Sequence, residues 1–244
     1  MKGIVLAGGL GTRLYPLTYA TNKHLLPVYN KPMIFYPIKT LVSAGITEIL
    51  VIVSGPHAGD FIGVLRNGKE LGVSHLEYAY QARPDGGIAD ALSLAEDFSD
   101  NESVTVILGD NTTDADISSF VEEFKSGATI FLKRLSNKSQ VKRFGVAVFD
   151  NKNPKKIIRI EEKPKIPKSE FVITGLYIYD SHVFDYIRKL KPSDRGEIEI
   201  TDVNNTYLNK GILNWVEFKG FWSDAGTFDT LYKANTYWAS RRGL

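Results

Sequence analysis

Residues 4–14 read Ile4-Val5-Leu6-Ala7-Gly8-Gly9-Leu10-Gly11-Thr12-Arg13-Leu14, and this stretch decides the fold of the chain. Its apolar first part, which stops at a glycine-rich loop, is the pattern of a buried strand that feeds a loop. Glycines let backbone N–H groups approach phosphate oxygens, and Arg13 can add a charge-assisted contact. The stretch therefore indicates an anion site at the end of the first strand. A tight turn that is merely rich in glycine remains the alternative.

Two familiar phosphate loops do not fit these residues. A Walker loop needs Gly-Lys followed by Ser or Thr, but Gly11 is followed by Thr12-Arg13. The dinucleotide fingerprint fails as well, because Leu14 stands where its third glycine belongs and no ribose-binding acid follows about 20 residues later.

The rest of the chain alternates between strand-like and helix-like segments. In the first half we expect strands at 4–7, 48–53, 75–80 and 104–108, and helices at 32–44, 59–65 and 88–95. In the second half we expect strands at 144–149, 157–160, 173–179 and 215–218, and helices at 182–190, 201–209 and 227–241. This alternation predicts a single α/β domain over residues 1–244, with a mostly parallel, Rossmann-like sheet flanked by helices. Residues 1 to about 135 would form the nucleotide-binding half.

The composition excludes several classes of function but does not identify one. The 244 residues suffice for one large α/β domain, and the 43% hydrophobic and 24% charged content is ordinary for a globular protein. A net charge of +2 gives no case for a nucleic-acid partner. The absence of cysteine excludes disulfides, thiolate metal sites and a cysteine nucleophile. With no signal-like start and no apolar run of about 20 residues, we expect a cytoplasmic protein with no membrane partner.

The charges are distributed unevenly along the chain. Residues 1–47 contain no Asp or Glu but five cations, namely Lys2, Arg13, Lys23, Lys31 and Lys39. A local positive field of this kind suits a phosphate-bearing ligand, although chance clustering on a solvated face explains the charges alone equally well.

One acidic residue follows a buried strand directly. Asp110 comes after the apolar run 104–108, and ligands of open α/β sheets bind at the carboxyl ends of strands. Mg²⁺ prefers one or two carboxylates together with phosphate oxygens, so Asp110 is a candidate metal ligand. A helix cap or a turn residue is the simpler interpretation of an isolated Asp at this place.

Several blocks together resemble one family. Residues 7–14, 22–28, 108–111, 161–164, 174–177, 195–202 and 224–227 resemble, in order and over almost the whole chain, the motifs of glucose-1-phosphate thymidylyltransferases. These belong to the sugar-1-phosphate nucleotidyltransferases. Two departures stand out: His24 occupies a position where many members have Gln, and the chain ends near Leu244, as in a short form.

The resemblance implies an activity and its substrates. It implies Mg²⁺-assisted, in-line attack of glucose-1-phosphate on dTTP, which gives dTDP-glucose and pyrophosphate for deoxysugar synthesis such as that of dTDP-rhamnose. Whether the protein forms a homo-oligomer stays open. Three rivals stay open as well: a uridylyltransferase, a non-catalytic sugar-nucleotide sensor, and a glycosyltransferase with an Asp-x-Asp metal motif at Asp114-Ala115-Asp116.

The resemblance also assigns residues. The catalytic set would be Arg13, Lys23 and Asp110, and the metal would be held by Asp110 and Asp224. The nucleotide would contact Gly8, Gly9, Gly11, Thr12, Arg13, Gln81 and Gly86. The sugar phosphate would lie in the second half, against Gly145, Glu162, Lys163, Ile173, Thr174 and Arg195. A Gln amide offers a donor and an acceptor, which matches thymine or uracil but not the whole edge of guanine.

Longer members that resemble this chain continue beyond the point that matches Leu244 and build a regulatory site there. We therefore expect a dTDP-sugar end product to inhibit by occupying the active site, in competition with dTTP.

Overall fold

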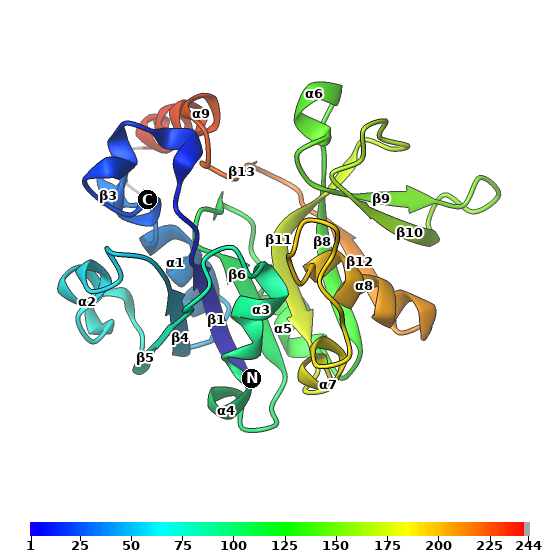
Figure 1. Ribbon diagram of the computed structural model, residues 1–244, viewed down its shortest axis with the longest axis horizontal. Coiled ribbons are helices and arrows are strands. Elements are labelled where there is room, and N and C mark those ends of the chain that lie inside the picture. The colour runs from blue at the N-terminus through cyan, green and yellow to red at the C-terminus, as the bar shows by residue number, and fades with distance from the viewer. Residues whose placement is uncertain (242–244) are drawn as a thin grey trace.

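The computed structural model describes residues 1–241, which fold around one central nine-stranded sheet (Figure 1). Its first half consists of β1 (Lys2–Ala7), β4 (Glu48–Val53), β5 (His75–Tyr80) and β6 (Val104–Leu108), all mutually parallel. Alternate residues of β1 enter two different cores: Ile4 and Leu6 pack into one, Val5 and Ala7 into the other. A strand that is buried on both faces reads as a continuous apolar run, as in residues 4–7.

The second half of the sheet follows a different rule. It contains β8 (Ala128–Arg134), β9 (Gly145–Phe149), β10 (Ile157–Glu162), β11 (Phe171–Tyr179) and β12 (Leu213–Glu217). The long strand β11 runs antiparallel to β6 on one side and to β8 on the other, and so joins the two halves. The fold class is confirmed as α/β, with a sheet that is parallel in its first half and mixed in its second.

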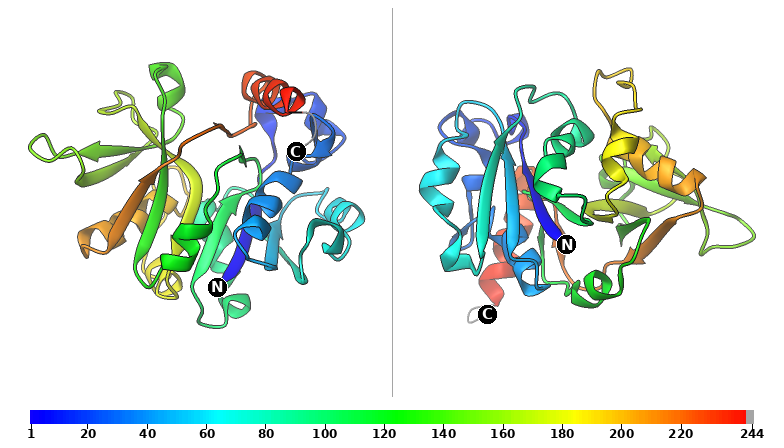
Figure 2. Two further views of the ribbon diagram at one scale, coloured as in Figure 1. Left: turned by 180° about the vertical axis from the view of Figure 1, so that it is seen from behind. Right: turned by 90° about the horizontal axis from the view of Figure 1, so that it is seen from below.

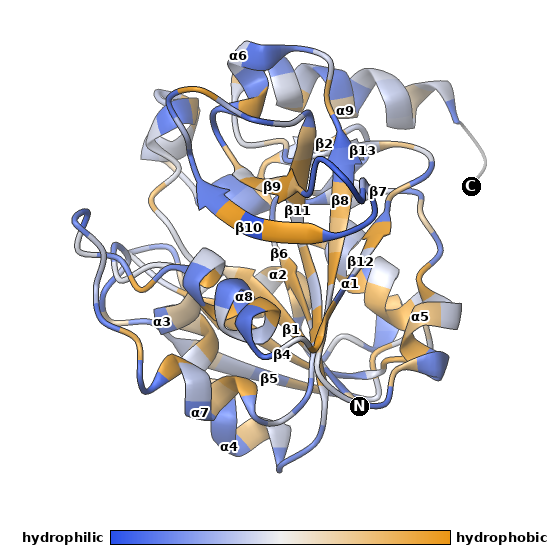
Figure 3. Cartoon of the chain, turned by 90° about the vertical axis from the view of Figure 1, so that its right-hand side faces the viewer, coloured by the Kyte–Doolittle hydropathy of each residue, from blue (hydrophilic) through white to orange (hydrophobic). Residues whose placement is uncertain are grey.

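Helices cover both faces of the sheet (Figure 2). They are α1 (Phe35–Ser43), α2 (Asp60–Leu65), α3 (Ile88–Ser93), α4 (Glu96–Ser99), α5 (Ser118–Glu123), α6 (Lys138–Val141), α7 (Val183–Ile187), α8 (Ile200–Asn209) and α9 (Phe228–Ser240). Coloured by hydropathy, the central strands are largely apolar while the helices carry polar outer faces (Figure 3). Among residues 1–241, no helix combines the length and the apolarity that crossing a membrane requires.

The last segment returns from the second half to the first. After β12 the chain forms β13 (Trp222–Ser223), which pairs with β7 (Thr112–Thr113), and then α9 lies beside the N-terminal loops (Figure 1). Thr227 caps α9 through Thr230, and Ala234 packs with Leu14 in a small separate core. This return path brings Asp224 to the end of β6.

Some expected elements differ from the structure. The strand β8 was not expected at all, and it pairs with β11 and β12, on the side of the second half. The helix expected from residue 32 begins at Phe35, because Lys31–Pro32 (β3) first pairs with Pro27–Val28 (β2) in a tight hairpin. The expected helix 88–95 ends at Ser93, and the one at 182–190 ends at Ile187.

Candidate active site

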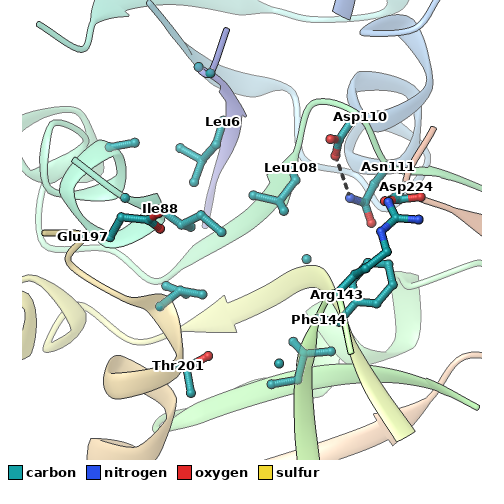
Figure 4. A pocket seen from close by; sticks show the side chains of 18 of the residues that line it. Leu6, Ile88, Leu108, Asp110, Asn111, Arg143, Phe144, Glu197, Thr201 and Asp224 are labelled. Carbon is teal, nitrogen blue, oxygen red and sulfur yellow. Dashed lines mark hydrogen bonds and ion pairs between the residues drawn. The ribbon is translucent and has the colours of Figure 1, made fainter. Parts of the chain in front are cut away.

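A cavity of about 380 Å³ opens between the two halves, at the carboxyl ends of β1 and β6. In Figure 4, Asp110, Asn111, Asp224 and Arg143 gather on one side of it, while Thr201 lies on the other. Twelve of the residues assigned from the sequence line this cavity: Gly8, Gly9, Arg13, Lys23, Gln81, Asp110, Gly145, Glu162, Lys163, Ile173, Thr174 and Asp224.

The glycine loop forms one wall of the cavity. The backbone N–H of Gly9 donates to Ser54 Oγ at 3.0 Å, and a methyl group added at Gly8 would lie 2.8 Å from Oε1 of Gln81. Gly11 has a φ of +65° and starts the short 3-10 turn Thr12–Leu14. Gly11 and Thr12 do not line the cavity; they direct the chain so that Arg13 does.

Lys23 and Asp110 form the first ion pair of the site. The distance from Lys23 Nζ to Asp110 Oδ2 is 2.5 Å, and the two side chains are only 13% and 10% exposed. Burial alone would raise the pKa of Asp110, but the positive charges of Lys23 and Arg13 and the neighbouring His24 lower it overall. Asp110 is therefore held as a carboxylate.

Arg143 and Asp224 form the second ion pair, at 2.8 Å between Arg143 Nη2 and Asp224 Oδ2. The Asp224 side chain is 9% exposed. Burial, followed by the negative charge of Asp110, raises the pKa of Asp224. The two carboxylates thus sense each other's charge, although they come from opposite ends of the sequence.

The carboxylates of Asp110 and Asp224 fit a magnesium ion by the chemistry of their donors. Within residues 1–241, no group of three or more His, Cys, Asp or Glu side chains is placed to hold a metal alone. Mg²⁺ commonly takes only one or two carboxylates and completes its octahedron with phosphate oxygens and water. The pair therefore suits a metal that arrives with a phosphate substrate.

His24, a departure from the family pattern, is one of the residues that line the cavity. It is 1% exposed, and its Nδ1 lies 2.7 Å from Asn22 Oδ1. Burial and the charge of Lys23 lower the pKa of His24 to about 3, so the ring stays neutral at physiological pH. The ring acts as packing between the loop of Lys23 and Gly109, where an added methyl group would lie 2.8 Å from its Cδ2.

Gln81 directly follows β5 and lines the cavity. Its side-chain amide is buried and donates from Nε2 to Asp90 Oδ2 at 2.8 Å. Gly86 does not line the cavity. It packs against Asp90, whose Oδ2 would lie 2.2 Å from a methyl group added at Gly86. Its carbonyl accepts from Ile198 N at 2.8 Å, which ties the loop of the first half to the second half.

The second half supplies an acidic and a basic side chain to the opposite wall. Glu162 Oε2 accepts a hydrogen bond from Thr201 Oγ1 at 2.6 Å, and Lys163 Nζ lies 3.5 Å from Glu162 Oε1. A methyl group at Gly145 would lie 3.2 Å from Thr201 Oγ1, so a side chain there would crowd this wall. Thr174 donates to the backbone of Phe131, which leaves mainly its own backbone for a ligand.

Arg195 lies beside the cavity rather than in its wall. Its guanidinium contacts three carboxylates, those of Glu199 at 2.8 Å, Glu197 at 3.4 Å and Glu162 at 3.5 Å. Its assignment to the sugar phosphate stays a prediction.

The rival metal motif lies outside the cavity. Asp114 accepts from the backbone N–H of Phe221 at 2.7 Å and contacts Tyr237 and Arg241. Asp116 accepts from the backbone N–H of Ser118. Asp114 ties its loop to the C-terminal segment, Asp116 stabilises a local turn, and neither lines the cavity.

The cavity residues that were not assigned from the sequence include Arg143, Asn111 and Tyr177. Asn111 accepts from Trp222 Nε1 at 2.6 Å and donates to Asp110 at 3.2 Å, so it links β13 to the carboxylate. Tyr177 is 2% exposed, and burial, followed by the charge of Glu162, raises its pKa. Asn111 follows Asp110 directly, which could have revealed it, but nothing in the sequence points to Arg143.

A parallel sheet whose glycine loop, cations and paired carboxylates meet at one edge defines an α/β enzyme that handles phosphate groups. The chain belongs to the nucleotidyl transferase family, which it matches over residues 2–241.

Individual relatives agree with this family. The chain is 44% identical to a glucose-1-phosphate thymidylyltransferase of Neisseria meningitidis over 245 residues, which cover 97% of this chain and 82% of the relative. It is 45% identical to the glucose-1-phosphate thymidylyltransferase of Mycolicibacterium smegmatis, with the same shares covered. A Bacillus anthracis crystal structure, assigned as a glucose-1-phosphate thymidylyltransferase in complex with a sucrose, is 50% identical with a TM-score of 0.90. That match covers 100% of this chain and 96% of the other.

Proposed function

We propose that this protein is a glucose-1-phosphate thymidylyltransferase, which converts dTTP and glucose-1-phosphate into dTDP-glucose and pyrophosphate. One observation carries the proposal: a single cavity brings the glycine loop, Arg13, Lys23 and the two carboxylates together with Glu162 on the facing wall. The names of the relatives at 44–50% identity support the choice of dTTP and glucose-1-phosphate.

The reaction joins two anions, so positioning and charge neutralisation dominate its catalysis. A phosphate oxygen of glucose-1-phosphate attacks the α-phosphorus of dTTP, a P–O bond forms, and the bond to pyrophosphate breaks in line. No nucleophilic side chain is needed. The electron pair leaves with pyrophosphate, whose negative charge Arg13 and the loop N–H groups stabilise.

Lys23 has the second role in this mechanism. Its Nζ lies at Asp110, between the loop and the rest of the cavity, where a donor can contact the phosphoryl group under attack. A flexible ammonium can follow the charge as it moves from the attacking to the leaving oxygen.

Asp110 and Asp224 would hold the magnesium ion. When bound, Mg²⁺ supplies Lewis-acid neutralisation of the phosphate charges. Asn111 would keep Asp110 in place for the metal, because it bonds to both Asp110 and Trp222. The segment that returns through β13 brings Asp224 to the same place.

Gln81 and Glu162 would choose the two substrates. Gln81 Oε1 lies at Gly8, inside the cavity, and offers an acceptor to the N3–H of thymine. Glu162 is a hydrogen-bond acceptor for sugar hydroxyls. We place the product in deoxysugar synthesis, such as the route to dTDP-rhamnose.

Pyrophosphate release tests the proposal. Purified protein with Mg²⁺, dTTP and glucose-1-phosphate should release one pyrophosphate for each dTDP-glucose formed, and omission of any component should stop the release. A panel that exchanges dTTP for UTP, and glucose-1-phosphate for other hexose-1-phosphates, separates a uridylyltransferase from a thymidylyltransferase. A protein that instead consumed dTDP-glucose without pyrophosphate would be a glycosyltransferase, and the proposal would fail.

A further inference from the structure

Both candidate metal carboxylates are already paired with a cation of the protein. Lys23 Nζ contacts Asp110 at 2.5 Å, and Arg143 Nη2 contacts Asp224 at 2.8 Å. Each of these carboxylates is only about one-tenth exposed, so its buried charge would destabilise the fold without a cationic partner. Lys23 already has a place in the proposed mechanism. Arg143 has none, and it is the residue to explain.

Arg143 reaches Asp224 from the opposite half of the molecule. It lies between α6 and β9, and its side chain points toward Asp224 along one side of the cavity (Figure 4). Among residues 1–241, the only hydrogen bond that its guanidinium donates goes to Asp224. The guanidinium also lies 5.6 Å from the ring centre of Phe144. With five N–H donors in a planar fork, most of its capacity to bind an anion is unused.

Arg143 contacts Oδ2 of the same Asp224 carboxylate that would be needed to hold Mg²⁺. A guanidinium and a divalent cation at one carboxylate repel each other, so each weakens the binding of the other. A guanidinium released from Asp224 remains beside the cavity, where substrate phosphates offer it a bidentate partner.

We propose that Arg143 is a built-in counter-ion of Asp224, which turns to a substrate phosphate when Asp224 takes a metal. The exchange keeps Asp224 neutralised throughout, and it makes metal binding and phosphate binding mutually favourable, since the phosphate stabilises the released guanidinium. Arg143 thereby couples the metal to the substrates. This inference rests on the proposed function for the identity of the phosphates, but its first part concerns the metal alone.

The first test measures Mn²⁺ binding by electron paramagnetic resonance, with no nucleotide present. Arg143→Ala removes the competitor, so Mn²⁺ should bind about tenfold more tightly than to the unaltered protein. Arg143→Lys keeps a cation and should stay near the unaltered value. Arg134→Ala is the matched control, because it removes the same charge from an exposed pair with Glu170 outside the cavity. Unchanged or weaker Mn²⁺ binding in folded Arg143→Ala would overturn the inference.

The second test addresses the phosphate. At saturating Mg²⁺, kcat/KM of Arg143→Ala for glucose-1-phosphate and dTTP should fall by about tenfold, and Arg143→Lys should recover part of it. A residue that only supported the fold would lower the melting temperature without tightening Mn²⁺ binding. Full activity of Arg143→Ala would overturn the move to a phosphate. If the unaltered protein formed no dTDP-glucose, the proposed function would fail, while the Mn²⁺ result would still decide the competition.

Discussion

The two halves of the cavity differ in how their cations are paired with carboxylates. In the first half, the cations Arg13 and Lys23 face a loop whose surrounding sequence, residues 1–47, has no acid at all. In the second half, Lys163 and Arg195 stand among acids, and the 39% exposed Arg195 contacts three carboxylates. Lys23 is paired with Asp110, but Arg13 has no carboxylate partner within residues 1–241, so the first half can accept an anion at Arg13. In the second half, a sugar phosphate must compete with carboxylates for each cation.

The largest effect is expected at Asp110, the candidate metal ligand of the first half. Asp110→Asn removes a negative metal ligand but preserves shape, so turnover should fall by about 10²- to 10³-fold. Pyrophosphate release measures this loss, with circular dichroism to check the fold. Asp116→Asn is the matched control, since Asp116 only caps a turn outside the cavity. Normal Mg²⁺-dependent turnover in folded Asp110→Asn would remove Asp110 from the site.

The next effect concerns the base end of the first half. If Gln81 contacts the pyrimidine, Gln81→Ala should cost roughly 1–3 kcal/mol in kcat/KM with dTTP and with UTP, and discrimination against purine triphosphates should shrink. Because Gln81 also donates to Asp90, the variant needs a control for local damage. Gln140→Ala, in α6 outside the cavity, provides one for the loss of an amide. Equal losses with every nucleotide would mean that Gln81 only supports the Asp90 loop.

A smaller effect is expected from the paired cations of the second half. Arg195→Ala should raise the KM for glucose-1-phosphate by about tenfold and leave the KM for dTTP unchanged, because one charged hydrogen bond to the sugar phosphate is lost. Arg159→Ala, which removes an exposed cation paired with Glu161, is the control. An unchanged KM for glucose-1-phosphate would show that the contacts of Arg195 with Glu199 and its neighbours are its whole role.

The difference between the halves also explains what the sequence could predict. The strands 48–53 and 104–108 have the expected ends, because a parallel strand buried on both faces is a continuous apolar run bounded by turns. The edge strand 75–80 also has the expected ends, although it is only partly buried. From the buried strands the position of Asp110 at the sheet edge follows directly. The sequence Ala128–Arg134 carries the same signal in Thr129-Ile130-Phe131-Leu132, but it was overlooked.

Contacts between distant segments could not be predicted in this way. The pair of Arg143 and Asp224 spans 81 residues, and it forms only because β13 returns across the cavity. No local period or turn encodes that path. Asp224 was assigned by family resemblance alone, and its own sequence looks like a turn. Of the acids around Arg195, Glu197 and Glu199 are close in sequence, but Glu162 lies 33 residues away, and its contact is visible only in the folded chain.

The smallest expected effect concerns stability, and it compares the carboxylate of each half. The positive charges around Asp110 outweigh its burial and lower its pKa, whereas burial and the charge of Asp110 raise the pKa of Asp224 from its ordinary value of 3.8. A lowered pKa means that the ionised form of Asp110 stabilises the fold at pH 7, and that this contribution is lost as the pH falls through the lowered pKa. A raised pKa means that the ionised form of Asp224 weakens the fold at pH 7, and that this penalty disappears as the pH falls below 3.8.

The same Asp-to-Asn substitution should therefore act with opposite sign at the two positions. With EDTA present, so that metal binding does not add stability, Asp110→Asn should lower the free energy of unfolding at pH 7 by about 1 kcal/mol. Asp224→Asn should raise it by about 1 kcal/mol, or roughly 2–4 °C in Tm, since Arg143, 27% exposed, can turn to water. Thermal unfolding at pH 7 and pH 4 measures both: the difference for Asp224 should shrink at pH 4, whereas that for Asp110 should persist there, because pH 4 is still above 3.8. If both variants shifted Tm in the same direction at pH 7, the two carboxylates would not differ in their electrostatic environment. The contrast between the halves would then not extend to the metal site.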